Sequence, residues 1–192
     1  MLDILREKDA PDAEFRRWRA IEVVGEIGPD AAPAVPFLKE ALTNENVWTR
    51  LEAASALARV GQPLPQALTV ATNLLVSGDD DALRARAAGV IGDFGVAALP
   101  SVPALVTALN DRRHDVRRVA GHALARIAAA ARDARRLDAV RPLSAASSAL
   151  AEQHLESSAP FSEAMRSLEA LRQHSMAARL ADVIHDHPPP PW

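Results

Sequence analysis

Two kinds of side chain in this sequence could take part in chemistry: a pair of histidines and a group of arginines. His185 and His187 flank Asp186, and imidazole and carboxylate groups are common Zn²⁺ ligands. Histidines two residues apart on a helix point to different faces, so we interpret this segment as a solvated helix end and expect no metal. Cysteine is absent, which excludes disulfides, thiol catalysis and cysteine-ligated zinc.

No catalytic arrangement is apparent elsewhere in the sequence. We find no glycine-rich phosphate loop, no serine, histidine and aspartate in the order of a hydrolase triad, and no carboxylate pair. His122 stands alone on an expected helix and is interpreted as a surface or interface residue. We therefore expect no catalytic residues and no cofactor, and enzymatic activity is the third of three functional hypotheses.

The arginines gather in one part of the chain. Nine arginines stand between Arg112 and Arg141 against three aspartates, a local net charge of +6, whereas the whole chain carries −3. Clustered arginines neutralise the phosphates of a nucleic acid. Binding of a nucleic acid or another polyanion through residues 112–141 is therefore the second hypothesis.

The apolar composition indicates which elements position these residues. Alanine occupies 40 of the 192 positions, whereas aromatic residues supply 4% and tyrosine none. Alanine has the highest helix propensity, and sheets favour β-branched and aromatic residues, so an all-α fold is expected. No apolar run of about 18 residues and no signal-peptide pattern is present, so we expect a cytoplasmic protein without a membrane partner.

A segment with one pattern recurs four times along the chain. Its copies begin at four almost equally spaced arginines: Arg17, Arg50, Arg84 and Arg117. Apolar residues three, seven and ten positions after each arginine mark one face of a helix. These columns are Ala20, Ala53, Ala87 and Ala120; Val24, Leu57, Ile91 and Leu124; and Ile27, Val60, Phe94 and Ile127.

Small residues complete the pattern. Gly25 and Gly92 occupy a column that holds alanine in the other copies, which predicts close approach of two helices. Ala128 ends the fourth copy, so the fourth helix is expected either to continue past it or to end less cleanly. The other three copies end in glycine, which adopts the left-handed cap conformation without strain: Gly28, Gly61 and Gly95.

A second helix is expected after each of these glycines. Pro33 and Pro100 stand five residues after a glycine, and proline fits the first turn of a helix, where its missing N–H needs no partner. Each unit is then a helix pair of about 33 residues that stacks on its neighbours to bury its apolar flank. The repeated arginines are expected to form a ladder of bonds to loop carbonyls or acids, with Asp81 and Asp111 as candidate partners.

The regular pattern ends after the fourth copy. Residues 1–130 are expected to form the repeat array, with a partial first helix at 2–8, and residues 131–187 a divergent helical cap of the same array. Apolar spacing within the cap predicts one or two helices over 131–153 and further helices at 161–174 and 175–185. Residues 188–192, four prolines and a tryptophan, are expected to form an extended tail, with docking into an aromatic groove as the alternative.

The repeated units resemble a known family. Residues 84–95 and 99–105, closed by Asp111, resemble the HEAT repeat, and most closely the short bacterial class named after phycobilisome lyases. The resemblance covers residues 12–128 and implies an α-solenoid, a superhelix of about four stacked antiparallel helix pairs followed by divergent helices. Such arrays serve as scaffolds, adaptors, enzymes and DNA-binding proteins, so function has to be argued from sites.

The sequence lacks the residues expected for the enzymes that the resemblance implies. Hydroxylases of the deoxyhypusine type bind two irons through His-Glu pairs, and no histidine here is followed by glutamate. Nothing indicates the tetrapyrrole pocket of a bilin lyase. HEAT-like DNA glycosylases use a basic concave face with tryptophan, whereas Glu22 and Glu26 stand near Trp18 and oppose a phosphate backbone.

The resemblance implies that these helices line a concave face, and the column opposite the buried one is the candidate binding surface. Its members, which we call the stripe, are Trp18, Glu22, Glu26, Leu51, Ser55, Arg59, Ala85, Gly89, Asp93, Arg118, His122 and Arg126. The stripe runs from acidic to basic, which would orient a partner of reversed polarity. The leading hypothesis is a non-catalytic scaffold that holds a protein or peptide there. Trp48 is expected to pack, and Trp18 either packs or contacts a ligand.

Overall fold

The computed structural model describes residues 13–139 and parts of the following segment (142–144, 146, 149–150, 159, 161–163, 165–166, 169–170 and 173), and these residues are helical or connecting, without a strand. One layer contains the helices that hold the repeated arginines: α2 (Ala13–Ile27), α4 (Val47–Arg59), α6 (Asp81–Asp93) and α8 (His114–Asp133). The other layer contains α3 (Val35–Ala41), α5 (Pro65–Ser77) and α7 (Val102–Ala108). Short 3₁₀ helices complete the connections: η1 (Gly28–Ala34), η2 (Gly95–Ser101) and η3 (Leu137–Ala139).

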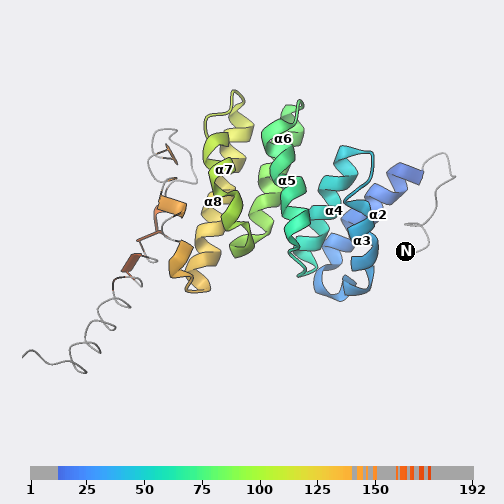
Figure 1. The fold of residues 1–192 in the computed structure, drawn as a ribbon, viewed down its shortest axis with the longest axis horizontal. Coiled ribbons are helices and arrows are strands. Elements are labelled where there is room, and N and C mark those ends of the chain that lie inside the picture. Colours follow the sequence, from blue (N-terminus) through green and yellow to red (C-terminus); the bar gives the residue numbers. More distant parts are fainter. Residues whose placement is uncertain are drawn as a thin grey trace, which may run out of the picture.

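The helices stack side by side along the molecule (Figure 1). In the first layer α2 packs on α4, α4 on α6, and α6 on α8. The helices α3, α5 and α7 each pack against the helix that follows them in the chain. Neither layer could bury its apolar flank alone, and stacking solves this problem. The predicted α-solenoid is therefore confirmed, with α2 and α8 at opposite ends of the described array.

Polar side chains and glycines set the ends of the helices. The Asn46 side chain accepts hydrogen bonds from the backbone N–H groups of Trp48 (2.9 Å) and Thr49 (3.3 Å) at the start of α4. Asp80 accepts one from Ala82 (2.9 Å) at the start of α6. These bonds satisfy N–H groups that have no partner within the helix. The predicted left-handed caps are confirmed by φ angles of +71°, +81° and +52° at Gly28, Gly61 and Gly95.

The fourth copy differs, as the loss of its glycine predicts. α8 continues past Ala128 to Asp133, and the chain turns at Arg135, which has a φ of +51°. The Arg136 N–H donates to the Ala131 carbonyl (2.8 Å), a bond that closes a helix end of this kind. The expectation that a new helix begins at residue 131 is therefore wrong, because the first residues of that range are the end of α8.

One apolar cluster of alanine and aliphatic side chains forms the core. The first two repeat columns are buried throughout. In the third column Ile27 was expected to point inward, yet it is 46% exposed, because α2 is the first described helix and lacks a described neighbour on its outer side. Among the residues described after α8, Leu143, Leu150 and Phe161 are buried in the same cluster.

Not all of the predicted segments lie within the residues that the structure describes. The partial helix at 2–8, the helix at 175–185 and the tail at 188–192 lie outside the described residues. The positions described between 161 and 173 are helical, as their apolar spacing predicts. The division of the chain into an array and a cap at residue 130 stays a prediction.

Two pairs of helices approach closely through small residues. A Cβ atom added at Gly25 of α2 would lie 3.2 Å from the Ala56 Cα of α4. One added at Gly92 of α6 would lie 3.0 Å from the Ala123 Cα of α8. Contacts this short leave no room for a side chain, so the small-residue column has the role that the sequence predicts.

The junction between α4 and α6 is built differently. Ala58 and Val90 occupy the corresponding positions there, and the two helices contact each other less extensively than the pairs on either side. The connections alternate as well, because η1 follows α2 and η2 follows α6, whereas α5 starts directly at Pro65 after the intervening glycine. The array therefore has a period of two repeats.

Replacing Ile91 by aspartate is expected to unfold the array. Ile91 is 0% exposed, and a carboxylate buried there would lack a partner. We expect Ile91→Asp to lower the free energy of unfolding by about 4 kcal/mol, measured by urea denaturation followed by circular dichroism. The control Ile91→Val, which removes one methyl group, should cost about 1 kcal/mol. A wild-type unfolding curve for the aspartate variant would contradict the stacked core.

Candidate functional site

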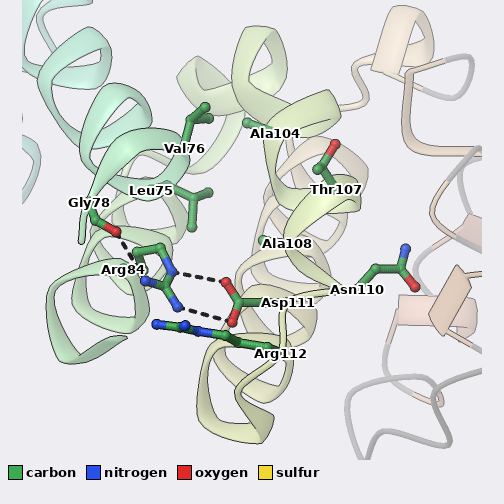
Figure 2. A pocket seen from close by; sticks show the side chains of 10 residues that line it. All are labelled: Leu75, Val76, Gly78, Arg84, Ala104, Thr107, Ala108, Asn110, Asp111 and Arg112. Carbon is green, nitrogen blue, oxygen red and sulfur yellow. Dashed lines mark hydrogen bonds and ion pairs between the residues drawn. The ribbon is translucent and has the colours of Figure 1, made fainter. Parts of the chain in front are cut away.

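Arg84 links the loops of two successive repeats (Figure 2). Its Nη1 donates to the Gly78 carbonyl (3.0 Å) in the loop before α6, and its Nε and Nη2 donate to the two carboxylate oxygens of Asp111 (2.9 and 3.2 Å) before α8. Nη2 also donates to Asp81 (2.6 Å). Because Arg84 is only 8% exposed, this is a buried bidentate ion pair, which is stronger and more directional than a surface pair.

Three of the four ladder arginines share one bonding pattern. The fourth, Arg17, pairs with Glu14 (2.9 Å). Position 111 is aspartate where the two preceding loops have Asn44 and Gly78, which explains why Arg84 gains a carboxylate from the next repeat. The Nη1 atoms of the other three arginines donate to the carbonyls six and five residues before them, which belong to Asn44 and Glu45 (Arg50), Gly78 and Asp79 (Arg84), and Asp111 and Arg112 (Arg117).

The same contacts keep Asp111 ionised. Burial favours its neutral form, but hydrogen bonds from Arg84 and from the backbone N–H of Arg113 (2.8 Å) outweigh burial and lower the pKa of Asp111 below its ordinary value of 3.8. The bond to Asp111 in turn raises the pKa of Arg84, against the effect of burial. The pair is therefore fully charged at neutral pH.

Removing the Arg84 side chain is expected to destabilise the array strongly. Arg84→Ala leaves the Asp111 carboxylate, 15% exposed, without its guanidinium partner, and we expect a loss of about 3 kcal/mol in the free energy of unfolding. The matched control Arg50→Ala removes bonds to carbonyls alone and should cost about 1 kcal/mol. Urea denaturation measures both values, and equal losses would show that the link to the next repeat contributes nothing.

The Asp111 contact also predicts a pH dependence. Because the folded-state pKa of Asp111 is lowered, its contribution to stability is complete above the unfolded-state pKa of about 3.9 and is lost as the pH falls through the folded-state value. The stability difference between the wild type and Asp111→Asn should therefore be large at pH 6 and should shrink toward pH 3. Urea denaturation at a series of pH values measures it, and a constant difference would refute the prediction.

The stripe lies on the layer of α2, α4, α6 and α8, but two of its members do not reach the surface. Leu51 is 0% exposed and packs into the core cluster. Ser55 is 1% exposed and lies beneath Arg86 and Asp93, with which its hydroxyl forms hydrogen bonds of 3.4 Å. The expectation that these two residues face a partner is therefore wrong. The other members are exposed or half-buried: Trp18, Glu22, Glu26, Arg59, Ala85, Gly89, Asp93, Arg118, His122 and Arg126.

Two groups of ion pairs connect the helices beside the stripe. Arg86 of α6 donates from Nε and Nη2 to both carboxylate oxygens of Glu52 of α4, each at 2.8 Å. Asp93 of α6 lies 2.6 Å from Arg126 Nη2 of α8 and 3.7 Å from Arg59 Nε of α4. These contacts bind α4, α6 and α8 to one another, so the charged groups on this face are held in fixed positions.

The sequence analysis did not identify the Glu52–Arg86 pair. Both residues occupy one column of successive repeats, and Glu52 is only 6% exposed. The hydrogen bonds that Arg86 donates to Glu52 outweigh burial and raise the pKa of Arg86. Opposite charges in equivalent positions of neighbouring repeats are the signal that could have identified the pair.

Aromatic side chains gather at the α2 end of the array. Phe15 is 65% exposed, and its ring centre lies 6.1 Å from that of Trp18. Trp48 packs against the core cluster, whereas Trp18 does not belong to it. The sequence analysis did not single out Phe15. A cavity of about 390 Å³, which we call the aromatic hollow, is lined by Glu14, Phe15, Trp18, Asn46, Trp48 and Thr49.

Stacked helix pairs of nearly constant spacing along the sequence define this chain as a helical-repeat solenoid. Residues 1–92 match the family model described as HEAT repeats, so this part of the chain belongs to the HEAT-repeat family. The resemblance to the HEAT repeat seen in the sequence is thus confirmed. Membership of the short bacterial class named after phycobilisome lyases stays a prediction.

Two solved structures of engineered proteins from the Northeast Structural Genomics Consortium are similar to this chain. The first has 22% sequence identity and a TM-score of 0.55, and the match covers 88% of this chain and 46% of the engineered one, so this chain spans about half of its length. The second has 20% identity and a TM-score of 0.48, with 89% and 96% covered. The first likeness supports the fold alone. No curated protein matches the sequence.

Metal-binding clusters and membrane-spanning helices are both absent from the residues that the structure describes. These residues contain no group of three or more histidine, cysteine, aspartate or glutamate side chains arranged to hold a metal ion. In the same part of the chain, no helix has the length and apolar character needed to span a bilayer.

Proposed function

We propose that this protein is a non-catalytic scaffold that binds a protein or peptide along the face formed by α2, α4, α6 and α8. The observation that supports this function best is an aromatic pair left outside the core on that face. Phe15 and Trp18 contact each other, and Phe15 is 65% exposed. Exposed aromatic residues are enriched where proteins bind partners, since they bury much area with few rotatable bonds.

The remaining surface of this face suits an elongated partner. Glu26 is exposed on α2, whereas the side chains of Arg118 and Arg126 on α8 are 44% and 54% exposed. Ala85 and Gly89 lie between these ends on α6 and would let a backbone approach closely. A partner of opposite polarity would bind in one orientation, and the cross-helix ion pairs reduce the ordering that binding requires.

Ion pairing argues against the alternative of nucleic-acid binding through residues 112–141. A nucleic acid binds through many cations at once, and its phosphates would have to compete with carboxylates that already contact six of these arginines. The pairs are Arg112 and Arg113 with Asp81, Arg118 with Asp115, Arg126 with Asp93, Arg132 with Asp133, and Arg136 with Asp138. A protein partner needs only the exposed parts of Arg118 and Arg126 (44% and 54%). The protein-binding function is therefore favoured, and nucleic-acid binding that weakens steeply with added salt would reverse this preference.

Combining Trp18→Ala with Arg118→Glu is expected to abolish partner binding without unfolding the array. Both side chains lie on the proposed face and are at least partly exposed, so helicity measured by circular dichroism should be unchanged. The wild type should capture at least about tenfold more protein from a lysate of the source organism than the immobilised variant does. The reason is that losing an aromatic hot-spot contact costs about 2 kcal/mol of binding free energy.

The matched control places the same kinds of change on the other layer. Val76→Ala on α5 and Lys39→Glu on α3 replace an exposed apolar residue and an exposed charge, and capture should remain at the wild-type level. Mass spectrometry identifies and quantifies the retained proteins. If the two double variants capture the same proteins in the same amounts, the proposed binding face is incorrect.

A further inference from the structure

The backbone that forms the aromatic hollow occurs a second time in the array. Between the first turns of α6 and α8 lies a hollow of about 430 Å³, lined by Asp80, Asp81, Ala82, Ala85, Arg113, Asp115 and Val116. This second hollow stands two repeats further along the chain, at the positions equivalent to the lining of the aromatic hollow. Ala82 takes the place of Phe15, Ala85 that of Trp18, and Asp115 that of Trp48.

The second hollow shows which side chains of the aromatic hollow the fold can do without. A hollow of similar volume occurs at both places, but the second one has no aromatic side chain in its lining. The rings of Phe15 and Trp18, which lie outside the core cluster, are therefore not needed to build the array. The second hollow is open although α5, the helix before α6, is in place.

The charges around the aromatic hollow favour an uncharged ligand. Both carboxylate oxygens of Glu14 are engaged, one by the Thr49 hydroxyl (2.9 Å) and one by Arg17 (2.9 Å). The Arg19 guanidinium lies 5.9 Å from the centre of the Trp18 ring and would repel a second cation there. An ammonium ligand, which aromatic cages bind, would therefore find both oxygens of Glu14 engaged and a guanidinium already beside Trp18.

The lining instead matches a run of prolines. Proline rings dock against aromatic side chains, and such runs are ordered before binding, so little entropy is lost. A proline run offers only carbonyl acceptors, because proline lacks an N–H. The side chains of Trp18, Trp48 and Asn46 all carry N–H donors. This chain contains one run of this kind, Pro188–Pro191, followed by Trp192.

We infer that the aromatic hollow binds the segment Pro188–Pro191 of a second copy of this chain. The segment follows α8 in the sequence, and α8 lies at the end of the described array opposite to α2 (Figure 1). Because the segment of one copy and the hollow of another are different surfaces, their contact is heterologous and joins copies head to tail. This inference rests on the proposed binding function and names the class of segment that one part of the face recognises.

A labelled peptide of residues 185–192 tests the inference directly. It is titrated into the full chain in which serine replaces the four prolines, so that no internal segment competes, and fluorescence anisotropy reports binding. We expect saturable binding that Trp18→Ala weakens at least about tenfold and that Val76→Ala on α5 leaves unchanged. A peptide with serine in place of the prolines should not bind.

Three results of this titration would overturn the inference. They are absence of binding, equal binding of the serine peptide, and binding that Trp18→Ala does not affect. Choline, added alone, should not bind, and binding of choline in place of the peptide would reveal a cation site and contradict the proposal. If the peptide fails while lysate capture still depends on Trp18 and Arg118, the inference is wrong but the proposed function stands.

Complementation tests the arrangement of two copies. The Trp18→Ala chain keeps the proline segment, and the chain with the four prolines replaced keeps the hollow. In sedimentation experiments each variant should stay monomeric at concentrations where the wild type associates, and an equimolar mixture should form a one-to-one complex. Peptide binding without any association of the wild type or the mixture would place the segment in its own copy and overturn the head-to-tail arrangement.

Discussion

The close approach of neighbouring helices is the constraint on which the rest of this structure depends. A solenoid has no central core, so each helix pair is stable only if it covers the apolar flank of the next. Gly25 against Ala56 and Gly92 against Ala123 bring the backbones together at two junctions. A larger side chain there would separate the helices and expose the alanine and leucine columns to water, which explains the high alanine content of the chain.

Charged side chains add direction to this non-directional packing. At the α4–α6 junction, where the small-residue contact is absent, Arg86 and Glu52 form a bidentate pair across the two helices. Arg84 and Asp111 form a second one between the first turn of α6 and the loop before α8. Apolar columns of alanine tolerate slippage along the helix, whereas bidentate pairs have one geometry. The ion pairs therefore fix the register of repeats that apolar packing alone would leave loosely defined.

A rigid array of this kind lets the lining of a hollow change without changing the fold. The two hollows have equivalent backbones and similar volumes of about 390 and 430 Å³, yet one is aromatic and the other is lined by alanine, aspartate and arginine. Stability comes from the columns beneath the surface, so the residues of the first helical turns are free to take on a binding role. Function in such a protein is accordingly decided by local side chains and not by the fold.

The periodic features of this protein can be predicted from its amino-acid sequence. Nearly equal spacing of Arg17, Arg50, Arg84 and Arg117, with glycine after three of the helices, predicts the helix pairs, their caps and a different end for the fourth helix. These features occur in several copies, so they can be recognised in the sequence without knowing which helices contact each other. The sequence also shows a tryptophan at position 18. It does not show whether the Trp18 ring packs inside the protein or contacts a ligand.

The solvent exposure of the stripe side chains, in contrast, depends on how neighbouring repeats pack against each other. Leu51 and Ser55 occupy the same sequence columns as more exposed residues, but both are buried. The long aliphatic side chain of Leu51 reaches the core, whereas Ser55 is covered by Arg86 and Asp93. The aromatic hollow arises from the first turns of α2 and α4, which belong to successive repeats, so no local pattern encodes it. Exposure depends on what a neighbouring repeat places above a residue, and only the packed array specifies that.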